Sequence, residues 1–229
     1  MIEVESVSRN FGDLKVLEDV TLSVDEGKTG VCLGPSGCGK TTLIKILSGL
    51  LDSSEGSYRV EGRKAVVFQD PRLLPWRTVE DNLKILEQIS EVDVEENLEE
   101  VLDMVGLEDF RDTYPGQISG GMRQRLALAR GLIIDPEVLF LDEPFASLDY
   151  ITKKRLTDLV SDIIEDDITV LAATHDLDVA LALADQIFIL GRDPCSVVEV
   201  REVGEEIEKE ELEDRLSNSY EEIRDGGEG

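Results

Sequence analysis

The most informative segment of this chain is Gly34-Pro35-Ser36-Gly37-Cys38-Gly39-Lys40-Thr41. Before it stands the short apolar run Thr29–Leu33, typical of a buried strand, and after it comes Thr41–Leu50, in which apolar residues recur at helical spacing. A glycine-rich loop of this kind between a strand and a helix is the P-loop pattern. Its glycines let backbone N–H groups converge on phosphate oxygens, and the N-terminal end of the helix adds positive potential. The segment therefore predicts a nucleotide-binding loop in an α/β core.

Two side chains of this loop carry specific chemistry. Lys40 is expected to neutralise the β- and γ-phosphates of ATP, and the Thr41 hydroxyl is expected to ligate Mg²⁺. The rest of the predicted phosphate cradle consists of Gly34, Pro35, Ser36, Gly37, Cys38, Gly39 and Thr42. For Cys38, a small residue that fits the loop is the simpler interpretation, and a reactive thiolate at the start of a helix is the alternative.

A second element, Val138–Pro144, carries two carboxylates directly after an apolar run. Ligands of α/β proteins bind at the carboxyl ends of the strands, where Asp142 and Glu143 would emerge. Asp142 suits an outer-sphere contact to Mg²⁺, and Glu143 suits a base that polarises the attacking water. A strand that ends in solvated acids is the alternative in so acidic a chain, but the P-loop favours the catalytic interpretation.

Hydrophobic periodicity organises the rest of the chain. Alternating residues predict half-buried strands at Ile2–Ser8 and Leu17–Val24, and continuous apolar runs predict buried strands at Ala65–Gln69, Thr169–Thr174 and Gln186–Leu190. Helical stretches separate the buried strands, which predicts a largely parallel sheet covered by helices. The predicted divisions are two halves of the ATP-binding core at residues 1–70 and 134–204, an inserted helical subdomain at 71–133, and an acidic C-terminal helix and tail at 205–229.

Charge and composition exclude several classes of function. The 23 basic and 51 acidic residues give a net charge of −28, which opposes direct binding to nucleic acid. A solvated acidic surface explains this excess, and adaptation to a salt-rich cytoplasm is the alternative. No apolar run is long enough to span a membrane, and Met1–Glu5 begins like a strand rather than a signal peptide. We therefore expect a soluble, intracellular protein whose membrane role is at most peripheral, in a reducing cytosol that suits its three cysteines.

A third element, Ser119-Gly120-Gly121, predicts a second anion site. Ser119 is a predicted helix N-cap, and the two glycines keep the amides of the first turn open. Two anion sites for one bound nucleotide are explained if two chains form a head-to-tail dimer, because each site would then meet the γ-phosphate held by the other subunit.

Together, the P-loop, Ser119-Gly120-Gly121 and Asp142-Glu143 resemble the motifs of the nucleotide-binding subunits of ABC transporters, over nearly the whole chain. This resemblance implies a P-loop NTPase core of the RecA-like type with an antiparallel N-terminal β subdomain. It also implies ATP hydrolysis between the two subunits of a homodimer, or of a pair of related ATPase subunits.

Further positions take their expected roles from the same resemblance. Phe11 would stack on adenine, although an aromatic residue near the start of a chain is often part of the core. Gln69 would touch Mg²⁺ and the attacking water, and His175, the only histidine, would contact the γ-phosphate. Ser147-Leu148-Asp149 resembles the D-loop, which communicates across the dimer and brings Asp149 to the nucleotide site.

The segment Gln69–Asn82 resembles that of importer ATPases of the nitrate, sulfonate and taurine group. There it receives a coupling helix of the integral membrane permease, and a solute-binding protein acts indirectly. The resemblance implies a peripheral position on the cytoplasmic face of the membrane. Leu73, Leu74 and Trp76 are candidates for this docking patch, and packing inside the helical subdomain is the alternative.

Three rival functions were weighed. Chromosome-organising and DNA-repair ATPases use similar motifs, but they carry long coiled coils between them, and no sustained heptads occur here. A scaffold that binds ATP without hydrolysis is expected to lack Glu143 or His175, and both are present. A soluble ABC-type ATPase that is not coupled to transport stays open at this point.

Overall fold

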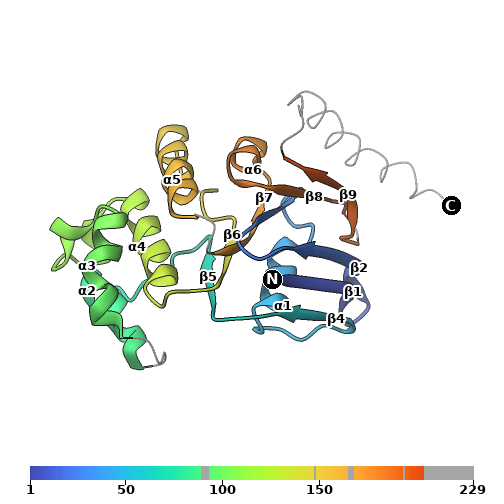
Figure 1. The fold of residues 1–229 in the computed structure, drawn as a ribbon, viewed down its shortest axis with the longest axis horizontal. Coiled ribbons are helices and arrows are strands. Elements are labelled where there is room, and N and C mark those ends of the chain that lie inside the picture. The colour runs from blue at the N-terminus through green and yellow to red at the C-terminus, as the bar shows by residue number, and fades with distance from the viewer. Residues whose placement is uncertain (89–92, 147, 165–167, 193, 204–229) are drawn as a thin grey trace.

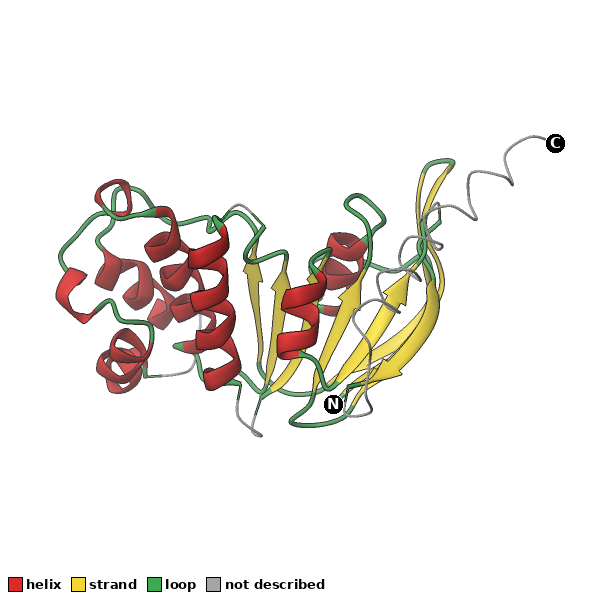
Figure 2. Ribbon diagram, turned by 90° about the horizontal axis from the view of Figure 1, so that it is seen from above, coloured by secondary structure: helices red, strands yellow, loops and turns green. Residues whose placement is uncertain are grey.

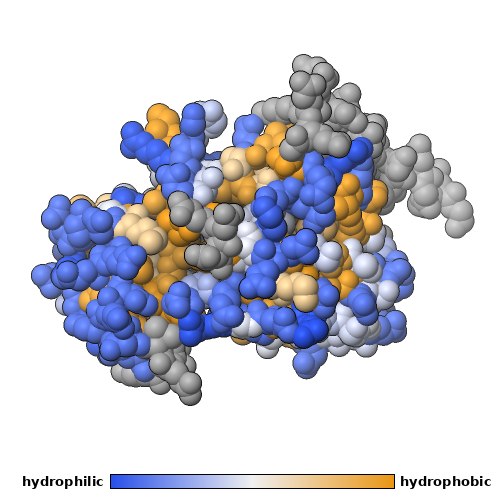
Figure 3. Space-filling model, in the orientation of Figure 1, coloured by the Kyte–Doolittle hydropathy of each residue, from blue (hydrophilic) through white to orange (hydrophobic). Residues whose placement is uncertain are grey.

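The structure is a computed structural model that describes residues 1–88, 93–146, 148–164, 168–192 and 194–203. The predicted acidic helix at 205–229 and Ser147 of the predicted D-loop lie outside the described residues. Figure 1 shows helices α2 to α4 gathered at one end of the molecule and the strands at the other. Figure 3 shows hydrophilic residues around the rim of this face, in keeping with the composition.

The central sheet has the strand order β5-β6-β7-β3-β8-β9. Its strands are β5 (Lys64–Phe68), β6 (Val138–Asp142), β7 (Thr169–Thr174), β3 (Thr29–Leu33), β8 (Gln186–Leu190) and β9 (Val197–Glu202). The first five run parallel, and β9 pairs with β8 antiparallel at the edge. Every residue of β3, β6 and β7 is buried, as expected for strands covered on both faces. The predicted parallel sheet is confirmed, and β9 is an addition that the sequence analysis did not foresee.

A second sheet is antiparallel and has the order β2-β1-β4. It consists of β1 (Ile2–Phe11), β2 (Leu14–Val24) and β4 (Glu55–Val60). The buried residue Ile2 pairs with Val24 on one side and Val60 on the other, so β1 is the central strand. This confirms the antiparallel N-terminal β unit, to which β4 adds a strand that was not predicted.

Helices cover both faces of the central sheet (Figure 2). Helix α1 (Lys40–Leu47) packs between the two sheets, in contact with β6 and β7 on one side and β2 and β4 on the other. Helix α6 (Leu177–Leu183) contacts β3 and β7, and α5 (Tyr150–Ile163) packs on α6. The strand β6 divides the hydrophobic core, because Val138 and Phe140 belong to the α1 side and Leu139 and Leu141 to the other.

The residues between the halves of the sheet form helices, with no strand among those described between β5 and β6. The α-helices there are α2 (Val79–Lys84), α3 (Val94–Met104) and α4 (Gly120–Leu132). Helix α4 contacts β5 and α5, so it joins this helical part to the sheet. The division into units with the boundaries given above stays a prediction. Within the part of the chain that the structure describes, no helix is long and apolar enough to cross a membrane.

Candidate nucleotide site

The strand register brings the predicted catalytic residues to one edge of the central sheet. Phe68 of β5 is level with Asp142 of β6, Asp142 is level with Ala173 of β7, and Thr174 is level with Leu33 of β3. The next residues along the chain are Gln69, Glu143, His175 and Gly34. Because parallel strands end together, these four positions meet at the carboxyl edge of the sheet.

The P-loop leaves β3 through a tight glycine-dependent path. The Gly34 N–H donates to the carbonyl of Thr174 at 3.2 Å, and Gly39 has φ +123°, a conformation that L side chains rarely adopt. A Cβ at Gly39 would lie 2.9 Å from a methyl group of Leu17 and 3.1 Å from Cβ of Cys195. Gly39 offers α1 no side-chain cap, so the first-turn amides of this helix keep their capacity for a phosphate.

Lys40 is held under this loop rather than in solvent. Its Nζ donates to the carbonyls of Gly34 and Pro35, at 2.8 Å each, and forms an ion pair with Glu143 Oε1 at 3.0 Å. Only 4% of the Lys40 side chain and 12% of the Glu143 side chain are exposed. A phosphate that reaches Lys40 therefore competes with a buried carboxylate.

Thr41 and Asp142 form the second contact of the site. The Thr41 hydroxyl donates to Asp142 Oδ1 at 2.9 Å. Burial raises the pKa of Asp142, and the hydrogen bond from Thr41 acts in the opposite direction. The two residues thus present a hydroxyl and a carboxylate oxygen side by side, the ligand chemistry that Mg²⁺ prefers.

Glu143 links Lys40 to His175. One carboxylate oxygen pairs with Lys40 and the other lies 2.7 Å from His175 Nδ1. The backbone of Glu143 has φ +49°, and its N–H donates to the carbonyl of Ala173 at 2.9 Å. A non-glycine residue in the left-handed region is strained, and such strain is concentrated at functional sites. The predicted base therefore sits between the predicted phosphate ligand and the predicted switch histidine.

Gln69 and Phe11 lie outside the group of contacts formed by Lys40, Glu143 and His175. Gln69 is exposed directly after β5, at the same edge of the sheet. Phe11 ends β1 with 46% of its surface exposed, and the guanidinium of Arg9 lies 4.7 Å from the centre of its ring. Phe11 is therefore not part of the core, which removes the alternative considered for it.

Ser119 and Asp149 lie apart from the Lys40–Glu143–His175 group, each at the start of a helix. The Ser119 hydroxyl accepts from Met122 N at 3.2 Å and caps α4, as predicted. Asp149 caps α5 by accepting from the amides of Ile151 and Thr152, and the Thr152 hydroxyl lowers the pKa of Asp149. Within the described residues no hydrogen bond or ion pair joins Ser119 or Asp149 to the P-loop of the same chain, which fits a site completed by a second chain.

Two contacts of this region were not foreseen. A Cβ at Gly121 would lie 2.6 Å from Cγ2 of Thr152, so Gly121 lets α4 approach α5 closely, whereas a Cβ at Gly120 would meet only a terminal nitrogen of Arg123, at 3.8 Å. Cys195 is buried against the P-loop and shares a hydrogen bond with Cys38 that lowers the pKa of Cys38. Both contacts join residues far apart in the sequence, so no local pattern could have predicted them.

The segment expected to dock a partner is firmly shaped by Asn82. This buried amide accepts from Leu74 N at 2.8 Å and donates to the carbonyls of Leu74, Arg77 and Thr78. Trp76, between these anchors, is 70% exposed, so for this side chain the structure excludes packing inside the helical part. Leu73, by contrast, packs against the core.

Comparison with known proteins gives the same picture. A family model described as "ABC transporter" matches residues 17–146. An aliphatic sulfonates import ATP-binding protein of Pseudomonas savastanoi pv. phaseolicola is 42% identical over 196 residues, covering 85% of this chain and 82% of that protein. A protein of the same description from Bacillus cereus is 37% identical over 214 residues, covering 88% and 85%.

Solved structures agree with these relatives. The ATP-binding cassette MJ0796, in a dimeric post-hydrolysis state bound to ADP and Pi, is similar with a TM-score of 0.76 and 28% identity, covering 89% of this chain and 99% of that one. Another dimeric structure of the same cassette, described as bacterial, gives a TM-score of 0.77 and 27% identity. These similarities confirm the predicted P-loop NTPase fold.

Proposed function

This chain belongs to the ABC transporter family as an ATP-binding and ATP-hydrolysing subunit, and on that premise we propose that it powers the import of an aliphatic sulfonate or a similar small organic anion. The relatives of the chain are import ATP-binding proteins, so a soluble ATPase uncoupled from transport is set aside. The cargo class rests on their printed names and not on any residue of this chain.

The observation that carries the mechanism is the chain of contacts from Lys40 through Glu143 to His175. We propose that Lys40 binds the phosphates, that Glu143 polarises the attacking water, and that His175 contacts the γ-phosphate beside Glu143. When ATP draws Lys40 away from Glu143, His175 still holds one carboxylate oxygen of Glu143. The other oxygen is then available to a water. Gln69, exposed at the same edge, is assigned to that water as well.

Mg²⁺ fits the oxygen pair of Thr41 and Asp142, which lie 2.9 Å apart. These residues would hold the ion together with phosphate oxygens of ATP, and the ion would supply charge neutralisation at the phosphates. Phe11 remains the proposed support for adenine, because one face of an exposed ring already carries Arg9 and the other is left for a base.

The proposed active unit is a two-fold dimer in which Ser119, Gly120 and Gly121 of one subunit face the nucleotide on the P-loop of the other, beside Asp149. The separation of these residues from Lys40 within one chain supports this arrangement. We place the dimer on the cytoplasmic face of the membrane, peripheral to a permease that receives the exposed Trp76 and its neighbours from Gln69 to Asn82. A solute-binding protein would deliver the cargo on the far side.

A complementation assay tests the shared site. Lys40→Ala and Ser119→Arg should each abolish ATP hydrolysis, but their heterodimer contains one intact site, formed by Lys40 of one subunit and Ser119 of the other. An equal mixture should regain about a quarter of the wild-type rate, since half of the random dimers carry one of two sites. A mixture as inactive as its components would refute the shared site.

The proposed contact of Trp76 with the permease has its own test. Trp76→Ala should leave hydrolysis by the isolated chain unchanged and weaken its association with the permease, because the side chain is 70% exposed.

The cargo assignment is tested separately. In proteoliposomes with permease and solute-binding protein, an alkanesulfonate should stimulate hydrolysis. Stimulation by sulfate alone would overturn the cargo class.

A further inference from the structure

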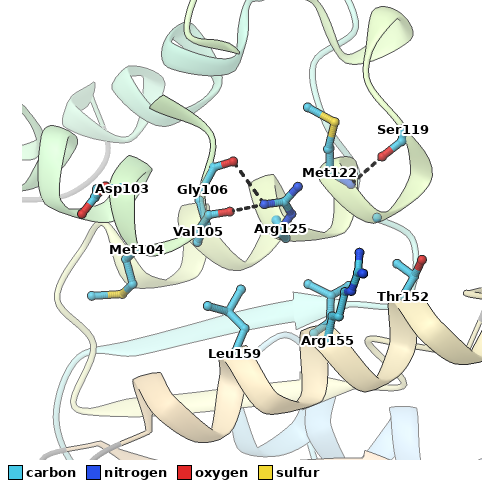
Figure 4. A pocket seen from close by; sticks show the side chains of 12 residues that line it. Asp103, Met104, Val105, Gly106, Ser119, Met122, Arg125, Thr152, Arg155 and Leu159 are labelled. Atoms are coloured by element: carbon cyan, nitrogen blue, oxygen red, sulfur yellow. Dashed lines mark hydrogen bonds between the residues drawn. The ribbon is translucent and has the colours of Figure 1, made fainter. Parts of the chain in front are cut away.

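A cavity of about 470 Å³ lies between the helical part and α5, away from the P-loop (Figure 4). Helix α4 and the end of α3 form one wall and α5 forms the other. None of the P-loop residues, nor Asp142, Glu143 or His175, is among its lining residues. Ser119 and Gly121, which the function proposed above assigns to the nucleotide of the partner, do line it, but that function gives no role to Arg125, Arg155 or the apolar lining.

Two arginines face the cavity from opposite walls. Figure 4 shows the Arg155 side chain extending from α5 toward α4, where Arg125 lies. Arg125 uses one terminal nitrogen to donate to the carbonyls of Val105 and Gly106, at 2.7 and 3.1 Å, which leaves its other N–H groups. Burial lowers the pKa of Arg125, yet an arginine keeps its charge at any physiological pH.

Arg155 has no carboxylate partner within the part of the chain that the structure describes. This is unexpected in a protein with 51 acidic and 23 basic residues. The Asp103 carboxylate also lines the cavity, but Figure 4 shows it beside Met104 at the α3 end, not between the two guanidinium groups. The Glu108 carboxylate lies near enough to Arg125 to favour its charged form, so the cation of this cavity that lacks a carboxylate partner among the described residues is Arg155.

A third donor is the hydroxyl of Ser119. Its oxygen accepts from Met122 N, so its proton remains free to donate. The Thr152 hydroxyl, in contrast, already donates to Asp149 Oδ2 at 2.7 Å. Arg155 belongs to α5, while Ser119 and Arg125 belong to the start and the middle of α4. Three donors from these two helices match the three oxygens of a tetrahedral oxyanion better than the two of a carboxylate.

The opposite end of the cavity is apolar. Met104 and Leu159 lie there in Figure 4, at the end away from Ser119, and Leu156 completes the α5 wall. A ligand that fills both ends therefore carries an anionic head and a short hydrocarbon chain, since burial of each methylene adds to its affinity.

We propose that this cavity binds a short alkyl sulfonate, with the oxygens between Arg125, Arg155 and Ser119 and the alkyl chain toward Met104 and Leu159. Binding itself does not depend on the function proposed above; only its meaning as recognition of the imported class on the ATPase rests on that function. A ligand in this place joins α4 to α5 and occupies the Ser119 hydroxyl that a second chain would offer to its nucleotide.

Isothermal titration of the full chain with butanesulfonate tests the site. The Lys40→Ala background weakens anion binding at the P-loop, so that a signal from this loop should fall while one from the cavity stays. Affinity should rise about fourfold for each methylene from methanesulfonate to butanesulfonate. Arg155→Ala should weaken the binding of butanesulfonate at least about tenfold, and Arg155→Lys should weaken it less. Both substitutions fall at an exposed position of α5, so the helix should stay folded.

Lys154→Ala is the matched control, because Lys154 is the exposed neighbour of Arg155 on the same helix and does not line this cavity. It should leave the affinity unchanged. The proposal is overturned if Lys154→Ala weakens binding as much as Arg155→Ala, if pentanoate binds more tightly than butanesulfonate, if chain length has no effect, or if no binding occurs at about 10 mM ligand. Failure of hydrolysis in the complementation assay would leave these results untouched, so the two proposals stand or fall separately.

Discussion

Glu143→Gln tests the competition between a carboxylate and a phosphate for Lys40. The pair is 3.0 Å long and nearly buried. Its gross Coulomb attraction is about 5.5 kcal/mol at an effective dielectric constant of about 20. Desolvation offsets most of this, and glutamine keeps a neutral acceptor, so we expect a net loss of about 2 kcal/mol in the nucleotide-free state.

Nucleotide binding should reverse the sign of this effect. ATP reaches Lys40 only after the pair with Glu143 is broken, so the wild-type protein loses about 2 kcal/mol that the variant never had. The variant should therefore bind AMP-PNP about 30-fold more tightly while it unfolds about 4–8 °C lower without nucleotide. AMP-PNP avoids hydrolysis by the wild type, and calorimetry with thermal unfolding measures both quantities.

Glu100→Gln is the matched control for charge. Glu100 is exposed on α3, and no ion pair of its side chain occurs among the described residues. It should change neither the melting temperature nor the affinity. If Glu143→Gln lowered the melting temperature but left AMP-PNP affinity unchanged, Lys40 would keep Glu143 in the bound state, and the competition inferred here would be wrong.

The remaining predictions concern charge and cysteine chemistry. Because burial raises the pKa of Asp142 above its ordinary 3.8, its ionised form disfavours the native state. Asp142→Asn should therefore raise the free energy of unfolding in urea by about 1 kcal/mol at pH 8. This gain should shrink at lower pH, where Asp142 of the wild type becomes protonated. A gain that stays constant with pH would refute the link between the charge of Asp142 and stability. Alkylation of Cys38 by iodoacetamide should have a midpoint below the ordinary 9.0, and Cys195→Ala should raise it, since the pKa of Cys38 is lowered mainly by its hydrogen bond with Cys195. The net charge of −28 predicts a melting temperature that rises from about 0.1 to about 2 M KCl, and a flat response would exclude adaptation to salt.

Local patterns predicted the core of the fold because its strands are buried on both faces. β3, β6 and β7 contain no exposed residue, so their apolar runs are unambiguous. β9 was missed because its alternation runs against the usual rule: Val198 and Val200 are exposed, while Glu199 and Arg201 are half-buried. β4 has only exposed and half-buried residues, and its apolar side consists of Tyr58 and Val60 alone, too short a pattern to mark a strand.

The candidate site was predictable in its members and not in their contacts. Lys40, Thr41, Asp142, Glu143 and His175 were all identified by residue type and position after strands. The Lys40–Glu143 pair was not foreseen, because each of the two groups was assigned to ATP chemistry and neither to the other. The close approach of Gly121 to Thr152 depends on how α4 packs on α5, which no spacing within either helix encodes.

The anchoring of the Trp76 loop by Asn82 has a mechanical consequence. Four hydrogen bonds from one buried amide fix the loop in advance, so a partner that grips Trp76 need not order it and loses little conformational entropy on contact. A stiff contact point also transmits displacement instead of absorbing it. A displacement of the helical part would then be transmitted to the permease with little loss of amplitude. Asn82→Ala would weaken this coupling without changing the nucleotide site.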